Sequence, residues 1–202
     1  MIKQPFNKLH THLCLALIVI PIFIQSCSDN DVPKAENEEE IITDVTLTFQ
    51  PMTGDSAVLA TASDPDGEGP ADLIIDSNIT LAANTTYTLM ISLTNSVEGE
   101  SITEEIEEEA DEHLFLFGWT NEVFSNPAGD GNIDNRGDLI NYSDSDDNGL
   151  PVGLETGWTT GNEGSGTFRV VLKHQPNIKS PTSSISDGSS DLDLTWNILI
   201  ID

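Results

Sequence analysis

Cysteine and basic residues are both scarce in this chain of 202 residues. The two cysteines, Cys14 and Cys27, lie near the N-terminus. The rest of the chain has no disulfide available, so its stability must come from a hydrophobic core. Seven basic residues stand against 35 acidic ones, which gives a formal net charge of −28 at pH 7. Such an acidic chain repels polyanions, so we expect no nucleic-acid partner.

No apolar run is long enough to span a bilayer, but the N-terminus has the features of a signal peptide. Lys3 and Lys8 precede an apolar run over 13–24, whereas a membrane-spanning helix needs about twenty apolar residues. The run ends in Ile-Gln-Ser-Cys at 24–27, which resembles the lipobox of bacterial lipoproteins. We therefore expect residues 1–26 to be removed and Cys27 to carry the lipid anchor. The alternative is an ordinary secretory signal with an incidental cysteine.

The segment over 27–40 is polar and acidic, with almost no apolar side chains. A segment of this composition buries too little surface to fold, so we expect a disordered tether. Its start, Ser-Asp-Asn-Asp at 28–31, is similar to the acidic signal that sends some Gram-negative lipoproteins to the cell surface. We expect an outer-membrane, lipid-anchored protein and favour display on the cell exterior. A charged linker without a sorting role is the alternative.

From residue 41 onward the sequence has the pattern of a β protein. Val45, Leu47 and Phe49 alternate with polar residues, and the same alternation recurs in the last ten residues. Short runs of this kind, separated by Gly, Pro and Asp turns, predict one antiparallel Ig-like β-sandwich over 41–202. The nine predicted strands are 45–49, 56–61, 79–81, 86–93, 114–119, 139–142, 156–160, 167–174 and 192–201.

One segment departs from the strand pattern. Ser101 and Glu104 have the spacing of a capping box, in which the serine side chain caps the helix and the glutamate follows three residues later. Ile102, Ile106 and Ala110 then follow at helical spacing. The segment predicts a short acidic helix over about 102–112.

A calcium-loop pattern is the most specific motif in the sequence. Asp144, Asp146, Asn148, Gly149 and Glu155 match D-x-[DN]-x-[DN]-G-x5-E at every fixed position. Oxygen ligands at alternate positions can converge on Ca²⁺, and glycine permits the sharp turn. Neither flank has a helical pattern, so the alternative is an acidic hairpin turn.

A second candidate site combines histidines from distant parts of the chain. On a helix, Glu109 and His113 would share a face, because residues four apart are neighbours. His174 is in phase with the apolar residues of the predicted strand 167–174, and therefore faces inward. If this strand lies beside the one that starts near His113, the three side chains can bind a transition metal. A capped or core histidine is the alternative for each imidazole.

The common catalytic motifs are missing. The sequence has no G-x-S-x-G, Walker loop, G-x-G-x-x-G or H-E-x-x-H, and we predict a non-catalytic protein. Trp119, Trp158 and Trp196 are candidates for a carbohydrate or peptide groove. We expect core packing for Trp119 and Trp196, and exposure for Trp158.

Three stretches, 39–49, 102–115 and 172–176, resemble a group of small lipoproteins labelled "type 1 periplasmic binding fold superfamily protein". That label implies alternating strands and helices in two lobes, whereas the strand pattern here predicts a β fold. The function we expect is that of a ligand- or metal-binding accessory to nutrient uptake, with an outer-membrane transporter as its partner. The alternative is a structural or adhesive surface domain with a calcium-stiffened loop.

Overall fold

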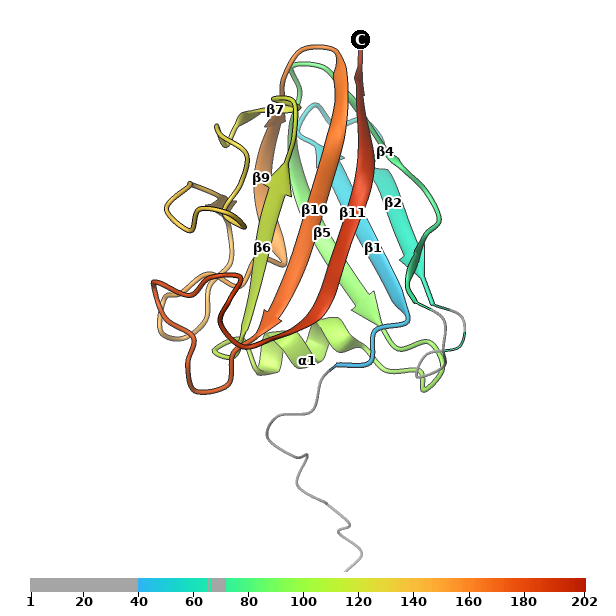
Figure 1. Ribbon diagram of the computed structural model, residues 1–202. Coiled ribbons are helices and arrows are strands. Elements are labelled where there is room, and N and C mark those ends of the chain that lie inside the picture. The colour runs from blue at the N-terminus through green and yellow to red at the C-terminus, as the bar shows by residue number, and fades with distance from the viewer. Residues whose placement is uncertain (1–39, 65, 67–71) are drawn as a thin grey trace, which may run out of the picture. The chain divides into compact units, whose positions relative to one another are not determined.

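Figure 1 shows the computed structural model, which describes residues 40–64, 66 and 72–202. These residues form two facing β-sheets with one helix across an end of the sandwich. The predicted signal peptide and nearly all of the predicted tether lie outside the described residues. The all-β sandwich predicted from the strand pattern is confirmed.

The larger sheet has the strand order β3-β2-β1-β5-β9-β7, with β8 also paired to β9. The smaller sheet has the order β4-β11-β10-β6. The bounds in the larger sheet are β1 Asp44–Pro51, β2 Val58–Ser63, β3 Ile74–Ile75, β5 Thr86–Thr94, β7 Phe124–Asn126, β8 Asn141–Tyr142 and β9 Glu155–Thr160. The smaller sheet contains β4 Ile79–Ala82, β6 His113–Trp119, β10 Gly164–His174 and β11 Ser189–Ile201. The helix α1 spans Ile102–Glu108.

The alternation of apolar residues places one face of each sheet in the core. Val45, Leu47 and Phe49 of β1 are fully buried. The ring of Phe49 packs edge-on against Phe168 of β10 in the opposite sheet, with centroids 6.1 Å apart. Side chains two residues apart on a strand share a face, so this pattern alone determines which face of β1 is buried.

Trp158 lies at the centre of the core, and the prediction that it is exposed is wrong. Its side chain is buried against Phe117, Trp119, Phe124 and Phe168. The indole nitrogen donates a hydrogen bond to the hydroxyl of Thr156, 2.7 Å away. Side chains alternate between the two faces of β9. Thr156, Trp158 and Thr160 point into the core, while Gly157 and Thr159 are only half-buried.

Two features of the sheets differ from the sequence prediction. The short strands β3 and β7 were not predicted, because two or three residues carry no periodicity. The smaller sheet is mixed rather than antiparallel, because β4 pairs with β11 in parallel. The described residues contain one helix, as the sequence predicts. Within these residues, no helix is long and apolar enough to cross a membrane.

A loop over 127–140 covers the outer face of β6. Ile133 packs there with Leu114, Leu116 and Val171 in a second apolar cluster. Gly131, with φ of +103°, passes so close to β6 that an added Cβ would lie 2.1 Å from the Phe117 carbonyl oxygen. Only glycine can adopt this positive φ without strain and also approach the β6 backbone so closely.

Tyr142 fastens this loop to β6. Its hydroxyl donates to the Phe115 carbonyl at 2.6 Å and accepts from the Asn132 side chain at 2.9 Å. Asn132 in turn accepts a hydrogen bond from the Phe117 amide. Burial raises the pKa of the Tyr142 phenol to about 12, because the charged phenolate would lose its hydration.

We predict that Tyr142 contributes stability that is fully present below pH 10 and is lost between about pH 10 and 12. The folded state holds the proton more tightly than the unfolded chain, so deprotonation favours unfolding, by roughly 2–3 kcal/mol for a shift of two pKa units. Urea unfolding across this pH range would measure the loss, with Tyr142→Phe as the reference. Absorbance titration of Tyr142 near pH 10 would contradict the prediction.

Candidate metal centre

The C-terminal end of α1 positions Glu109. Ser101 caps the helix by accepting a hydrogen bond from the Glu104 amide, as the capping box predicts. Ile102 and Ile106 anchor the helix in the core. The helix ends at Glu108, and Glu109 is its C-cap, with its amide still bonded to the Glu105 carbonyl. The predicted end near 112 is therefore too late.

The strand register brings the two histidines together. His113 begins β6 and His174 ends β10, and the two residues are directly paired across the antiparallel ladder. Their imidazole rings stack with centroids 4.8 Å apart and an interplanar angle of 8°. His113 is 0% exposed and His174 is 3% exposed. His174 is buried, as its phase in the strand predicts, and the strand pairing on which the shared site was conditional is present.

One group of three potential metal ligands is found among the described residues, and it consists of Glu109, His113 and His174. Within these residues, no other group of three or more histidine, cysteine or carboxylate side chains is placed to share an ion. One ligand atom from each lies within 4.8 Å of the others. Metal–ligand bonds of about 2.0–2.2 Å place ligand atoms roughly 3–4 Å apart. The ligand atoms would therefore have to move closer, and the stacked imidazole rings would have to turn so that their lone pairs converge on one ion. The route to this arrangement differs from the prediction, because His113 is on a strand and not on the helix.

Protein acceptors orient both imidazoles. Nδ1 of His113 lies 3.1 Å from the Glu109 carbonyl oxygen, and Nε2 of His174 lies 3.3 Å from a carboxylate oxygen of Glu112. A carbonyl or carboxylate oxygen accepts, so each contact places the imidazole proton on that nitrogen. The lone pair then lies on the other ring nitrogen of each histidine. Metal-binding histidines have this outer contact as a rule.

Two further acidic residues beside the imidazoles were not identified from the sequence. Glu112 contacts His174, and an oxygen of Asp191 lies 4.0 Å from Nε2 of His113. Asp191 comes from β11, at the start of the C-terminal run of alternating apolar residues. The position of Asp191 immediately before this apolar run was the only feature of the sequence that could have indicated it. Carboxylates are too frequent in this chain for that feature to distinguish Asp191 from the others.

The predicted calcium loop uses its carboxylates internally. The Asp144 carboxylate accepts hydrogen bonds from the amides of Gly153, Leu154 and Glu155, between 2.7 and 3.2 Å. One oxygen of Asp146 accepts from the amides of Asn148 and Leu150. The side chains of Asn148 and Glu155 are exposed. The four predicted ligands thus lie in an acidic turn that is stabilised by hydrogen bonds from backbone amides to Asp144 and Asp146. Calcium binding by these residues stays a prediction.

A buried lysine supplies a positive charge next to this turn. Nζ of Lys179 lies 3.0 Å from the second oxygen of Asp146, and it donates to the Ala110 carbonyl at 2.6 Å. Both charged side chains are almost fully buried. Burial alone raises the pKa of Asp146, but hydrogen bonds from Leu150 and Lys179 and the charge of Lys179 lower it below its ordinary value. Lys179 thereby links the acidic turn to the segment that joins Glu109 to His113.

A large open cavity at the opposite end of the sandwich offers no comparable site. It has a volume of about 770 Å³ and is lined by Trp119, Phe124 and residues of the adjoining loops. Trp119 and Phe124 are both buried, so neither ring presents an open face for stacking on a sugar. Trp196 is buried in the core, as expected.

Cys27, the predicted lipidation site, lies outside the described residues.

We predict that Lys179→Met destabilises the fold by roughly 2–4 kcal/mol, because it leaves the Asp146 carboxylate buried without its counter-charge. Urea unfolding would measure the change. The matched control is Arg169→Met, which breaks the half-exposed Arg169–Asp193 ion pair and should cost about 1 kcal/mol or less. Equal losses for the two variants would contradict the structural role of Lys179.

Comparison with protein-family models, curated proteins and solved structures found no match for the chain. No relative therefore assigns a role to the acidic helix end or to the paired histidines. The assignment of function depends on the geometry of Glu109, His113 and His174.

Proposed function

We propose that this protein binds a divalent transition-metal ion without catalysing a reaction, with Glu109, His113 and His174 as ligands. The convergence of two buried imidazoles and one carboxylate within 4.8 Å is the observation that carries the proposal. Imidazole and carboxylate are common ligands of Zn²⁺ and of other first-row divalent ions. The outer contacts from the Glu109 carbonyl and from Glu112 leave one lone pair on each imidazole for the ion.

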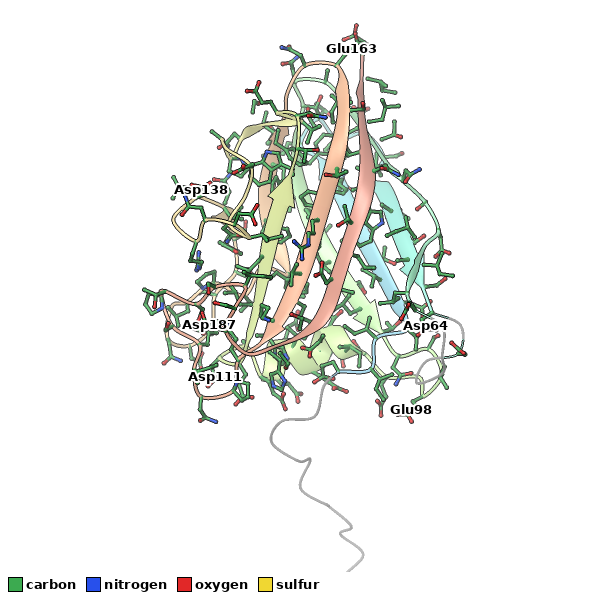
Figure 2. All side chains as sticks on the ribbon, in the orientation of Figure 1. Asp64, Glu98, Asp111, Asp138, Glu163 and Asp187 are labelled. Carbon is green, nitrogen blue, oxygen red and sulfur yellow. The ribbon has the colours of Figure 1, made fainter. Side chains whose placement is uncertain are left out.

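The charge of the domain is consistent with cation capture. Acidic side chains surround the sandwich, from Glu163 at one end to Glu98 and Asp111 at the end that carries α1 (Figure 2). Such a field raises the local concentration of cations and speeds their arrival. The burial of both imidazoles suits retention of an ion better than turnover of a substrate.

The cellular role that we propose is accessory to nutrient uptake. A lipid on Cys27 would hold the protein in the outer membrane, facing the cell exterior, where a bound ion can be passed to a transporter. This part of the proposal is supported by the sequence alone, through the lipobox-like residues at 24–27 and the acidic residues that follow.

A structural or adhesive domain stiffened by calcium has less support. The carboxylates of Asp144 and Asp146 already accept hydrogen bonds from backbone amides, and Lys179 lies beside Asp146. A calcium ion would have to compete with these partners.

We predict that the purified protein binds one equivalent of Zn²⁺, and that His174→Gln weakens the affinity at least tenfold by removing a ligand. Isothermal titration of the full chain in detergent would measure both. The decisive variant combines His113→Gln with His174→Gln, because it removes both proposed imidazole ligands. In the unprocessed chain it leaves His10 and His12, so any remaining binding is located elsewhere. Unchanged stoichiometry and affinity in this folded variant would refute the proposed site.

We predict that Cys27→Ala abolishes lipid attachment and moves the protein from the membrane fraction to the soluble fraction. Expression in a Gram-negative host, with labelled fatty acid and cell fractionation, would test this. Cys14→Ala is the matched control and should still be lipidated. Label retained by the Cys27→Ala variant would contradict the assignment.

A further inference from the structure

A groove without charged side chains crosses the outer face of the smaller sheet, at the end away from α1 (Figure 1). Its volume is about 450 Å³, within the range of roughly 300–1,000 Å³ that is usual for ligand pockets. In a chain with 35 acidic residues, a concave surface of this size that is lined by no carboxylate stands apart from the rest of the molecule. Its polar side chains include Asn78, Thr80, Thr120, Asn121, Thr167 and Asn197.

Hydrogen bonds hold several of these side chains in place. The hydroxyls of Thr120 and Thr167 lie 3.1 Å apart, and the Thr120 hydroxyl also accepts a hydrogen bond from the Thr167 amide. Nδ2 of Asn121 donates to the Ser165 carbonyl at 3.0 Å. A side-chain amide has two N–H donors and a carbonyl oxygen, and this contact uses one of the donors. The groove is therefore preformed and retains donors and acceptors for a ligand.

The turn after β6, which forms one side of the groove, has an unusual backbone. Asn121 and Glu122 have φ of +59° and +54°, a region that asparagine tolerates but that is costly for glutamate. Gly166 of β10 makes room for this turn, since an added Cβ would lie 2.6 Å from the Thr120 carbonyl oxygen. Backbone strain of this kind is concentrated at ligand-binding sites. Thr120 and Asn121 also line the large cavity beside Trp119, so the two hollows adjoin.

The chemistry of the groove favours a neutral ligand that is rich in hydroxyl groups. A cation would find no carboxylate among the lining residues, and the net charge of −28 repels anions. Amide and hydroxyl side chains donate and accept hydrogen bonds, as the hydroxyls of a sugar do. Leu199 is 45% exposed in the groove and offers an apolar contact for the C–H groups of a sugar ring.

A peptide is a less suitable ligand for this surface. Extended peptides commonly bind by adding a strand to the edge of a sheet through their backbone. The groove lies on the face of the sheet, where the backbone groups of β10 and β11 already pair with each other.

We propose that this groove binds a neutral oligosaccharide. The side-chain amides and hydroxyls supply hydrogen bonds, and no aromatic ring is required for stacking. The groove is a second site, separate from the metal centre, because Thr167 lies beside the pair Trp119–Phe168 at one end of the ladder between β6 and β10, whereas the paired histidines lie at the other.

The first test is a binding screen with the labelled full chain in detergent. The array carries neutral glucans, mannans, xylans and galactans, with anionic polygalacturonate, cationic chitosan and an uncharged glycine–serine peptide for comparison. We expect saturable binding to at least one neutral polysaccharide that persists at high salt. Attraction of chitosan to the acidic surface should disappear at high salt, because salt screens exposed charges.

The second test locates the binding with Asn197→Ala, using an oligosaccharide from the polysaccharide that binds. Thr195→Ala is the matched control, since Thr195 is exposed on the same strand but does not line the groove. We expect Asn197→Ala to weaken the affinity roughly threefold to tenfold through lost hydrogen bonds. Thr195→Ala should have no measurable effect. Isothermal titration measures both, with circular dichroism as the folding control.

The third test introduces a charge into the groove without changing its shape. Asn121→Asp replaces the amide by a carboxylate, and aspartate tolerates the left-handed backbone. Asn177→Asp is the control, because Asn177 is also exposed, has φ of +60° and lies in a loop near the other end of the sandwich. Both variants have the same net charge. We expect weaker oligosaccharide binding in Asn121→Asp alone.

Three outcomes would overturn the proposal. The first is no binding to any neutral polysaccharide. The second is a preference for polygalacturonate or for the uncharged peptide. The third is equal affinity in the groove variants and their controls, which would place the binding elsewhere on the protein. Zinc affinity should be unchanged in Asn197→Ala and Asn121→Asp, so this proposal and the metal centre can fail independently.

Discussion

The register of β6 against β10 is the constraint on which the rest of the structure depends. The register pairs Trp119 with Phe168 at one end of the sandwich and His113 with His174 at the other. Because side chains alternate between faces, a shift of β6 by one residue would move His113 and the core aromatics of β6 to the outer face. The burial of Phe117, Phe168 and the surrounding rings therefore holds the register, and the register in turn aligns the two imidazoles. Core packing and the candidate site are stabilised by the same interaction.

Two of the four basic residues in the described part of the chain, Lys173 and Lys179, are used inside the fold. Lys173 is held by Gly188 and Ser190, and Lys179 by Ala110 and Asp146. These contacts secure the loop over 175–188 and the end of α1, both of which border the histidines. The large excess of acidic residues remains at the surface (Figure 2). The protein thus has a strongly negative exterior, and two buried lysines secure the segments that border the paired histidines.

The candidate site lies where three kinds of structure meet. A helix end contributes Glu109, two strand ends contribute the imidazoles, and a bulge in β11 lies beside His113. Regular strands and helices leave their backbone groups paired, whereas their ends and bulges have groups available to orient side chains. The Glu109 carbonyl is one such group, since it faces His113. This position explains how a mostly hydrophobic sandwich can hold several polar side chains at its edge without interrupting its core.

Local periodicity and spacing were enough to predict the class of fold, the buried faces of β1, β10 and β11, and the cap of α1 at Ser101. They also selected Glu109, His113 and His174 as a candidate site, although they placed His113 on the helix. The stacking of the two imidazoles, the position of Asp191 beside His113 and the central place of Trp158 in the core became apparent only in the folded chain. These features depend on pairings between strands that are far apart in the chain, such as β6 with β10, and no local pattern encodes which strands become neighbours.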